Sequence, residues 1–133
     1  MRSPDDPTLG GSLRPRGPIQ LAVSTRYEGR TTVIGVAGEL DILTVTKLSN
    51  RLEDAIRRRH GDLVIDLSHA EFIDSMGLHA LLNMQRRLFR QARALTVICP
   101  PGAARNAIEL ARLSESLGVV SSFADYRLRR ASP

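Results

Sequence analysis

Apolar and polar residues alternate along the first ordered part of the chain in a pattern typical of half-buried β-strands. Residues 19–24 place apolar side chains at every second position, and residues 31–37 are rich in Val, Ile and Thr. Such alternation predicts strands with one buried face. Glu28 and Gly29 supply a turn between them, because glycine adopts positive φ at little cost. The motif GELD, at residues 38–41, ends this predicted hairpin.

The spacing of apolar residues then changes to three and four, which predicts amphipathic helices. The stripe of the first helix consists of Val45, Leu48, Leu52, Ala55 and Ile56. The stripe of the second consists of Leu78, Leu81, Leu82, Leu88 and Phe89. A third helix is expected from about residue 103 to 113, after the turn at Pro100-Pro101-Gly102.

Short apolar runs lie between these helices. Residues 63–67 and 94–99 are short, largely apolar runs, as in central strands that are covered on both faces, and residues 117–120 predict a last short strand. The order is β-β-α-β-α-β-α-β, which predicts an α/β domain with a mixed, largely parallel sheet and an antiparallel hairpin strand at one edge. The domain is expected over residues 18–128, between a disordered tail of residues 1–17 and a short tail of residues 129–133.

Composition narrows the class of protein. The 133 residues are 42% hydrophobic and 25% charged, and tryptophan is absent. Cys99 is the only cysteine, which excludes an internal disulfide. No apolar run reaches the roughly 18 residues of a membrane span, and the N-terminus lacks the apolar centre of a signal peptide. A cytoplasmic protein with no membrane partner is expected.

The net charge of +5 raises the question of nucleic-acid binding. The basic clusters are short, at residues 57–59, 86–87 and 129–130, and the first two fall on polar faces or ends of predicted helices. Aromatic residues, on which single strands stack, make up only 4% of the chain. We therefore expect no direct nucleic-acid partner.

The sequence offers little support for catalysis, a metal or a cofactor. His69 lies near Asp74 and Ser75, so a Ser-His-Asp arrangement has to be considered. The local sequence I-D-S-M-G lacks the first glycine of a nucleophile elbow, G-x-S-x-G. The histidines also lack the i, i+4 spacing of a helical metal site. Neither catalytic residues nor a cofactor are expected.

The segment EFIDSMGL, at residues 71–78, is the strongest candidate for function. Asp74 suits a helix N-cap, which makes Ser75 the first helical residue. Gly77 in the first turn costs helix stability, about 0.5–1 kcal/mol relative to alanine, so it is expected where another backbone or a bulky group comes close. The segment also follows the C-terminal end of a parallel strand, where α/β folds place functional sites. On these grounds alone, a plain helix cap and a functional serine remain equally supported.

The pairing of GELD with DLSHAEFIDSMGLHALL resembles the STAS domain of bacterial anti-sigma factor antagonists, over roughly residues 19–126. The resemblance implies a non-enzymatic regulator of transcription and stress response that works by partner switching. Such a protein binds a serine-kinase anti-sigma factor and releases a sigma factor. Phosphorylation ends the binding, and a serine phosphatase restores it.

Carried over residue by residue, the resemblance assigns the phosphorylation site to Ser75 and an acidic residue near it to Asp41. Partner-binding residues are expected at Asp41, Asp74, Met76, Gly77 and Leu78. Met76 stands where many members carry Ser or Thr, which leaves Ser75 as the only acceptor in the motif. The protein is expected to be a monomer or a weak dimer. Alternatives are a STAS scaffold module of a larger signalling assembly, the STAS component of a membrane transport complex, and a hydrolase that uses Ser75.

Overall fold

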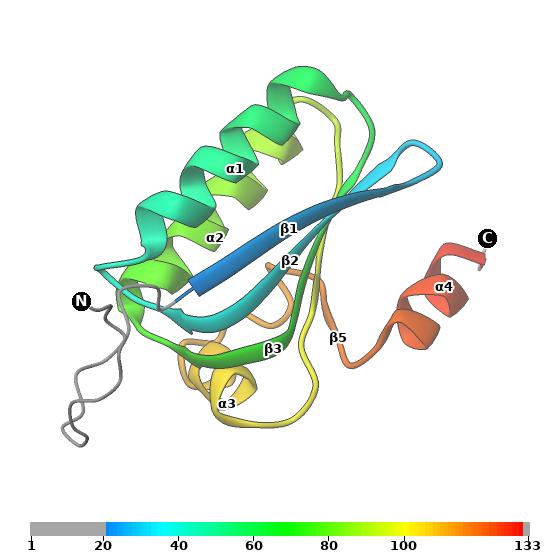
Figure 1. The fold of residues 1–133 in the computed structure, drawn as a ribbon. Helices are drawn as coiled ribbons and strands as arrows, with labels where there is room; N and C mark the ends of the chain where they lie inside the picture. The colour runs from blue at the N-terminus through cyan, green and yellow to red at the C-terminus, as the bar shows by residue number, and fades with distance from the viewer. Residues whose placement is uncertain (1–20, 132–133) are drawn as a thin grey trace, which may run out of the picture.

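A computed structural model describes residues 21–131 of the chain (Figure 1). The predicted N-terminal tail of residues 1–17 lies outside the described residues. In chain order the elements are β1 (Leu21–Glu28), β2 (Thr31–Leu40), α1 (Val45–Arg58), β3 (Leu63–Ile73), α2 (Ser75–Arg90), β4 (Leu95–Ile98), α3 (Ala103–Leu110), β5 (Val119–Val120) and α4 (Phe123–Ala131).

The strands form one sheet in the order β1-β2-β3-β4-β5. β1 pairs with β2 in antiparallel fashion, and the other neighbours are parallel. The predicted fold class is therefore confirmed. Each strand from β3 onward is added on the same side of the sheet, and right-handed crossovers then place their helices on one common face. Figure 1 shows α1 and α2 side by side across that face.

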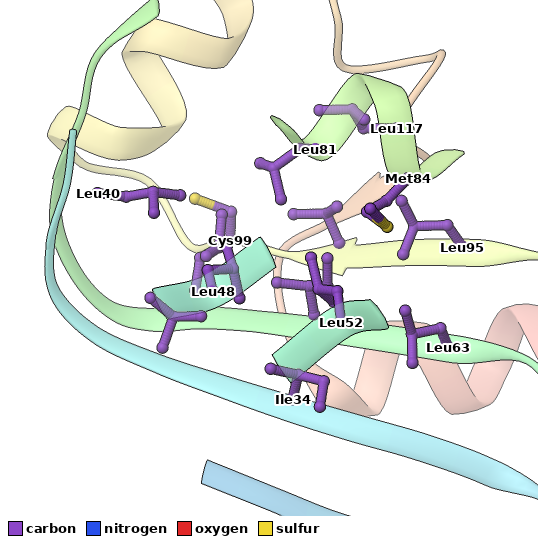
Figure 2. Packing of buried hydrophobic residues seen from close by; sticks show 14 of the residues in the cluster. Ile34, Leu40, Leu48, Leu52, Leu63, Leu81, Met84, Leu95, Cys99 and Leu117 are labelled. Atoms are coloured by element: carbon purple, nitrogen blue, oxygen red, sulfur yellow. The ribbon is translucent and has the colours of Figure 1, made fainter. Parts of the chain in front are cut away.

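The main core lies between this face and helices α1, α2 and α3 (Figure 2). The stripe predicted for α1 is confirmed, with Val45 half-buried and the other four residues buried. In α2 the buried positions are Gly77, Ala80, Leu81, Met84 and Leu88. The prediction for Phe89 was wrong, because it is exposed. At about 100° per residue, Ala80, Met84 and Leu88 fall on one side of Leu81 around the helix, and Phe89 falls on the other side, outside the buried stripe.

A second, smaller core covers part of the opposite face of the sheet. Its sheet residues are Val33, Val64, Ile98 and Val120. Helix α4 places Tyr126 on them, and Phe123 meets the Tyr126 ring edge-on with the ring centroids 6.4 Å apart. No helix was predicted here, and the expected domain boundary at residue 128 falls inside α4.

Arg93 joins the ends of α1 and α2. Its guanidinium donates to the carbonyl oxygens of Ile56, Arg59 and Gly61, at 3.3, 2.6 and 2.9 Å. The last carbonyls of a helix lack partners inside the helix. Arg93 supplies them from the segment after α2, where burial lowers the pKa of its guanidinium.

The second half of β3 differs from the sequence prediction and positions the site. The predicted strand ended at residue 67, but β3 continues to Ile73. The extension pairs with the end of β2, where Glu39 lies opposite Phe72 and Leu40 opposite Ile73. Two register shifts allow this pairing, between Gly35 and Ala37 and between Gly38 and Glu39. GELD and FIDS therefore lie side by side at the C-terminal ends of β2 and β3.

Candidate functional site

Asp74 caps helix α2. Its backbone is extended, and its Oδ1 accepts hydrogen bonds from the backbone N–H groups of Met76 (2.9 Å) and Gly77 (3.1 Å). Two of the four orphan donors at the helix start are satisfied in this way. The predicted N-cap is confirmed, and the Asp74 carboxylate is held at the start of the helix.

Ser75 is the first residue of α2 and is exposed. Its hydroxyl makes no hydrogen bond with any described residue, whereas the Ser68 hydroxyl donates to Asp66 Oδ1 at 2.6 Å. The Ser75 oxygen is thus accessible to a reagent or a partner protein. Its place beside the positive end of the helix dipole is compatible with added negative charge.

Gly77 allows the strand that ends in GELD to approach this helix closely. A β-carbon at residue 77 would lie 2.8 Å from Leu40 Cγ and 2.9 Å from the Leu40 carbonyl oxygen. That same carbonyl accepts a hydrogen bond from Asp74 N–H at 3.1 Å. The close approach expected from the sequence is confirmed, and the neighbouring backbone is Leu40. Gly77 is itself buried and Leu78 half-buried, so both lie beneath the surface that Ser75 forms.

Asp41 organises the turn that leads from β2 into α1. Its Oδ1 accepts from the backbone N–H groups of Leu43 (2.9 Å) and Thr44 (3.2 Å). The Thr44 hydroxyl donates to the Glu39 carbonyl at 2.6 Å and accepts from Asp41 N–H at 3.0 Å. These contacts fix the turn directly after Leu40, the residue that binds Asp74.

Four large apolar side chains are exposed at this edge of the sheet. Ile42 is 65%, Leu43 83%, Phe72 47% and Met76 42% exposed. We call these four residues and Ser75 the Ser75 surface. Exposed apolar groups gathered at one place mark interaction sites. Sequence reasoning expected only Met76, although the apolar pair Ile42-Leu43 directly after a turn-forming aspartate was a usable signal.

The two segments that form this surface carry negative charge, and the basic residue next to them, Lys47 in the first turn of α1, donates through its Nζ to the Leu21 carbonyl at 2.9 Å. Residues 38–46 and 66–85 contain no lysine or arginine. They do contain the carboxylates of Glu39, Asp41, Asp66, Glu71 and Asp74. A phosphate on Ser75 would enter a field that is already negative, next to an Asp74 carboxylate that occupies the N–H groups of Met76 and Gly77.

The described residues show neither a Ser75–His69 pair nor a metal site. No hydrogen bond among the described residues joins Ser75 to His69, which is exposed on β3. Within residues 21–131, no group of three His, Cys, Asp or Glu side chains could hold a metal ion. None of the helices in this range is long and apolar enough to cross a membrane.

The family model described as "Mlab, STAS domain" matches residues 23–121. The anti-sigma-F factor antagonist RsfB of Mycobacterium tuberculosis is 25% identical over 108 residues, which are 81% of this chain and 88% of RsfB.

Solved structures have the same fold. An anti-sigma factor antagonist from Mycobacterium paratuberculosis superposes with a TM-score of 0.75 at 26% identity, covering 82% of this chain and 92% of that one. Unphosphorylated SpoIIAA, also an anti-sigma factor antagonist, gives a TM-score of 0.68 at 23% identity, covering 84% of this chain and all of that one. The family match spans most of the chain, including both halves of the site, and the protein is a member of the STAS domain family.

Proposed function

We propose that this protein is an anti-sigma factor antagonist that binds a serine-kinase anti-sigma factor through the Ser75 surface and is switched off by phosphorylation of Ser75. The observation that carries the proposal is the exposed, unbonded hydroxyl of Ser75 among exposed apolar side chains. The names of its relatives support the same role, since RsfB and SpoIIAA are both anti-sigma factor antagonists.

The partner-binding residues divide by position. Ile42, Leu43 and Met76 supply apolar area, which drives association when it is removed from water. Asp41 and Asp74 hold the two turns that present this area. Gly77 acts from below, because it sets how closely α2 approaches β2, and Leu78 packs against the main core beneath the surface. In this proposal, binding of this protein to the anti-sigma factor displaces the sigma factor that the anti-sigma factor holds.

In the phosphoryl transfer, the kinase supplies ATP and the catalytic base, and this protein supplies the acceptor hydroxyl of Ser75. The Ser75 oxygen attacks the γ-phosphorus of ATP bound in the kinase, the bond from that phosphorus to ADP breaks, and the hydroxyl proton leaves to a base of the kinase. The products are phosphoserine and ADP. A serine phosphatase reverses the state by hydrolysis, which releases inorganic phosphate and restores the hydroxyl.

Added charge explains why phosphorylation would end binding. A phosphoserine carries about −1.5 to −2 charges at neutral pH. It would lie beside Asp74, whose carboxylate already takes the nearby backbone donors. Burying this dianion against a partner without new cationic contacts is unfavourable. A penalty of about 3 kcal/mol would weaken binding more than about a hundredfold.

Two substitutions test the switch. Ser75→Ala keeps a neutral surface that cannot be modified, so calorimetry with the purified kinase and ADP should show binding like that of the unmodified parent. Ser75→Asp should bind more weakly, because it adds a charge beside Asp74. Both variants should fold. Ser75→Ala removes an exposed hydroxyl, and Ser75→Asp places an acidic residue at a helix N-terminus, which the helix dipole favours. Ser116→Ala changes an exposed serine outside the site and should change neither binding nor phosphorylation.

Incubation with the kinase and ATP, followed by peptide mass spectrometry, should find phosphate on Ser75. Phosphate found only on Ser68, Ser114 or another residue would disprove the assignment. If folded Ser75→Asp bound as tightly as Ser75→Ala, charge at this position would not control the partnership. The STAS scaffold module, which need not release a sigma factor, would then be the better proposal.

A further inference from the structure

The segment that carries Ser75 and the hairpin end of the sheet differ in their charged residues. The end with Ser75 has five carboxylates and no lysine or arginine in its two segments, residues 38–46 and 66–85. Arginines gather at the other end, where the β1–β2 hairpin turns. Arg26 and Arg30 come from the hairpin, Arg59 from the end of α1, and Arg127 and Arg130 from α4. Figure 1 shows the hairpin tip far from the start of α2.

An open cavity of about 510 Å³ lies between the hairpin turn and α4. Its charged lining consists of the guanidinium groups of Arg30, Arg127 and Arg130 and the carboxylate of Glu28. Thr31 and Tyr126 add hydroxyl groups. The lining itself has three cations against one anion and is net positive, and the carboxylate of Asp62 also acts on Arg130 from outside the lining. Its volume falls within the range of small-molecule sites, about 300–1,000 Å³.

The guanidinium groups of α4 are held in place before any ligand binds. Arg130 donates through one nitrogen, to Thr31 Oγ1 at 2.9 Å and to the Tyr126 hydroxyl at 2.8 Å. Arg127 lies over the Phe123 ring, with Cζ 5.6 Å from the ring centroid. Holding a guanidinium plane in advance lowers the entropy lost when it forms paired hydrogen bonds to an oxyanion.

The guanidinium groups of these three arginines keep N–H donors that no group within residues 21–131 occupies. Arg30 is exposed and makes no hydrogen bond or ion pair within residues 21–131. Arg127 meets Glu28 Oε2 at only 3.5 Å, while Arg26 holds the same oxygen at 2.6 Å. Arg130 keeps its second terminal nitrogen and Nε for a further acceptor. Planar guanidinium groups with free N–H pairs match the oxygens of a phosphate group.

We propose that the cavity between the β1–β2 hairpin and α4 binds a phosphate or diphosphate group of a small molecule through Arg30, Arg127 and Arg130. The site lies at the opposite end of the sheet from Ser75, so binding there does not compete with a partner on the Ser75 surface. Its ligand is a compact anion, because the arginines line a concavity and not an extended groove. Glu28 opposes the ligand by its charge.

The full chain can be titrated with sodium pyrophosphate at low ionic strength, with backbone amide NMR shifts as the measurement. We expect shifts centred on residues 28–31 and 126–131, with a Kd below about 1 mM. Arg30→Gln should weaken binding about tenfold, because it removes a charge-assisted hydrogen bond and leaves the internal contacts of the fold unchanged. Glu28→Gln should tighten binding, because it removes the opposing carboxylate.

Arg90→Gln is the matched control. It removes an exposed arginine of α2 that has no hydrogen bond or ion pair within the described residues. This variant and Ser75→Ala should bind pyrophosphate like the parent, so the outcome is independent of the proposed switch. Equal weakening by Arg90→Gln and Arg30→Gln would overturn the proposal in favour of diffuse counterion attraction. Binding of single-stranded DNA, an acidic peptide or phosphatidylglycerol vesicles at this end, with no response to pyrophosphate, would overturn it in favour of a macromolecular or membrane partner.

Discussion

Replacing Gly77 with alanine sets two physical effects against each other. Alanine is favoured over glycine inside a helix by about 0.8–1 kcal/mol. Against this, the new β-carbon would lie 2.9 Å from the Leu40 carbonyl oxygen and 3.1 Å from Ile73 Cγ2. The obstructing oxygen belongs to the backbone, so it cannot move aside by a side-chain rotation. Helix α2 and the end of β2 must separate instead.

The magnitude follows from the groups that are displaced. Overpacking a buried position costs about 1–3 kcal/mol. The hydrogen bond from Asp74 N–H to the Leu40 carbonyl weakens with it, which costs about 0.5–1.5 kcal/mol. After the gain in helix propensity is subtracted, Gly77→Ala should lower the free energy of unfolding by about 2 kcal/mol. Since the Leu40 carbonyl holds Asp74 at the start of α2, next to Ser75, the variant should also be phosphorylated more slowly at Ser75.

Urea unfolding followed by far-ultraviolet circular dichroism measures the effect, because the chain has no tryptophan to report by fluorescence. The matched control is Asn83→Ala, at an exposed position of the same helix. It should stabilise the protein by about 0.5 kcal/mol through propensity alone. If Gly77→Ala were also stabilising, by about 1 kcal/mol, the close contact with Leu40 would have no energetic weight and the argument would be refuted.

Three further predictions concern other parts of the fold. Leu81→Ala should lower the free energy of unfolding by about 2–5 kcal/mol, whereas Met76→Ala should change it little but weaken kinase binding; equal large losses in thermal stability would contradict the assignment of core and surface. Arg93→Met should cost about 2 kcal/mol in urea unfolding, because it leaves the carbonyls at the end of α1 without their charged donor; an unchanged midpoint would show that water replaces it fully. Burial raises the pKa of the Cys99 thiol, so its contribution to stability should be complete below the unfolded-state value of about 8.5 and should be lost as pH rises above it. Cys99→Ala should therefore lose less stability than the parent between about pH 7 and 10, and identical losses would refute a buried, protonated thiol.

Local signals in the chain were sufficient for the helices of the main core and for the cap of the site. The stripe of α1 follows from spacing alone, because a helix of fixed pitch presents every third or fourth residue to the same face. The cap at Asp74 was equally predictable, since its carboxylate bonds to N–H groups only two and three residues away. Phe89 shows the limit of such patterns, because it was predicted at the end of the buried stripe of α2 and its side chain is exposed.

Features that depend on pairing over long distances were decided by the tertiary structure. The continuation of β3 to Ile73 has no local signal, because it exists only where β2 offers a partner strand through two register shifts. Helix α4 lies where no helix was predicted, because the burial of Tyr126 against an apolar face of the sheet stabilises it.

The sequence by itself determined the order of elements, the buried stripe of α1 and the position of Ser75 at a helix start, since each depends on residues a few positions apart. Only the tertiary structure brought Leu40 against Gly77, and only it gathered Thr31 and Arg130, 99 positions apart, at one cavity. The physical reason is the same for both. Helix caps and apolar stripes depend on residues a few positions apart in the sequence. Close approach between distant segments depends instead on how the strands pair and on which face of the sheet each helix covers.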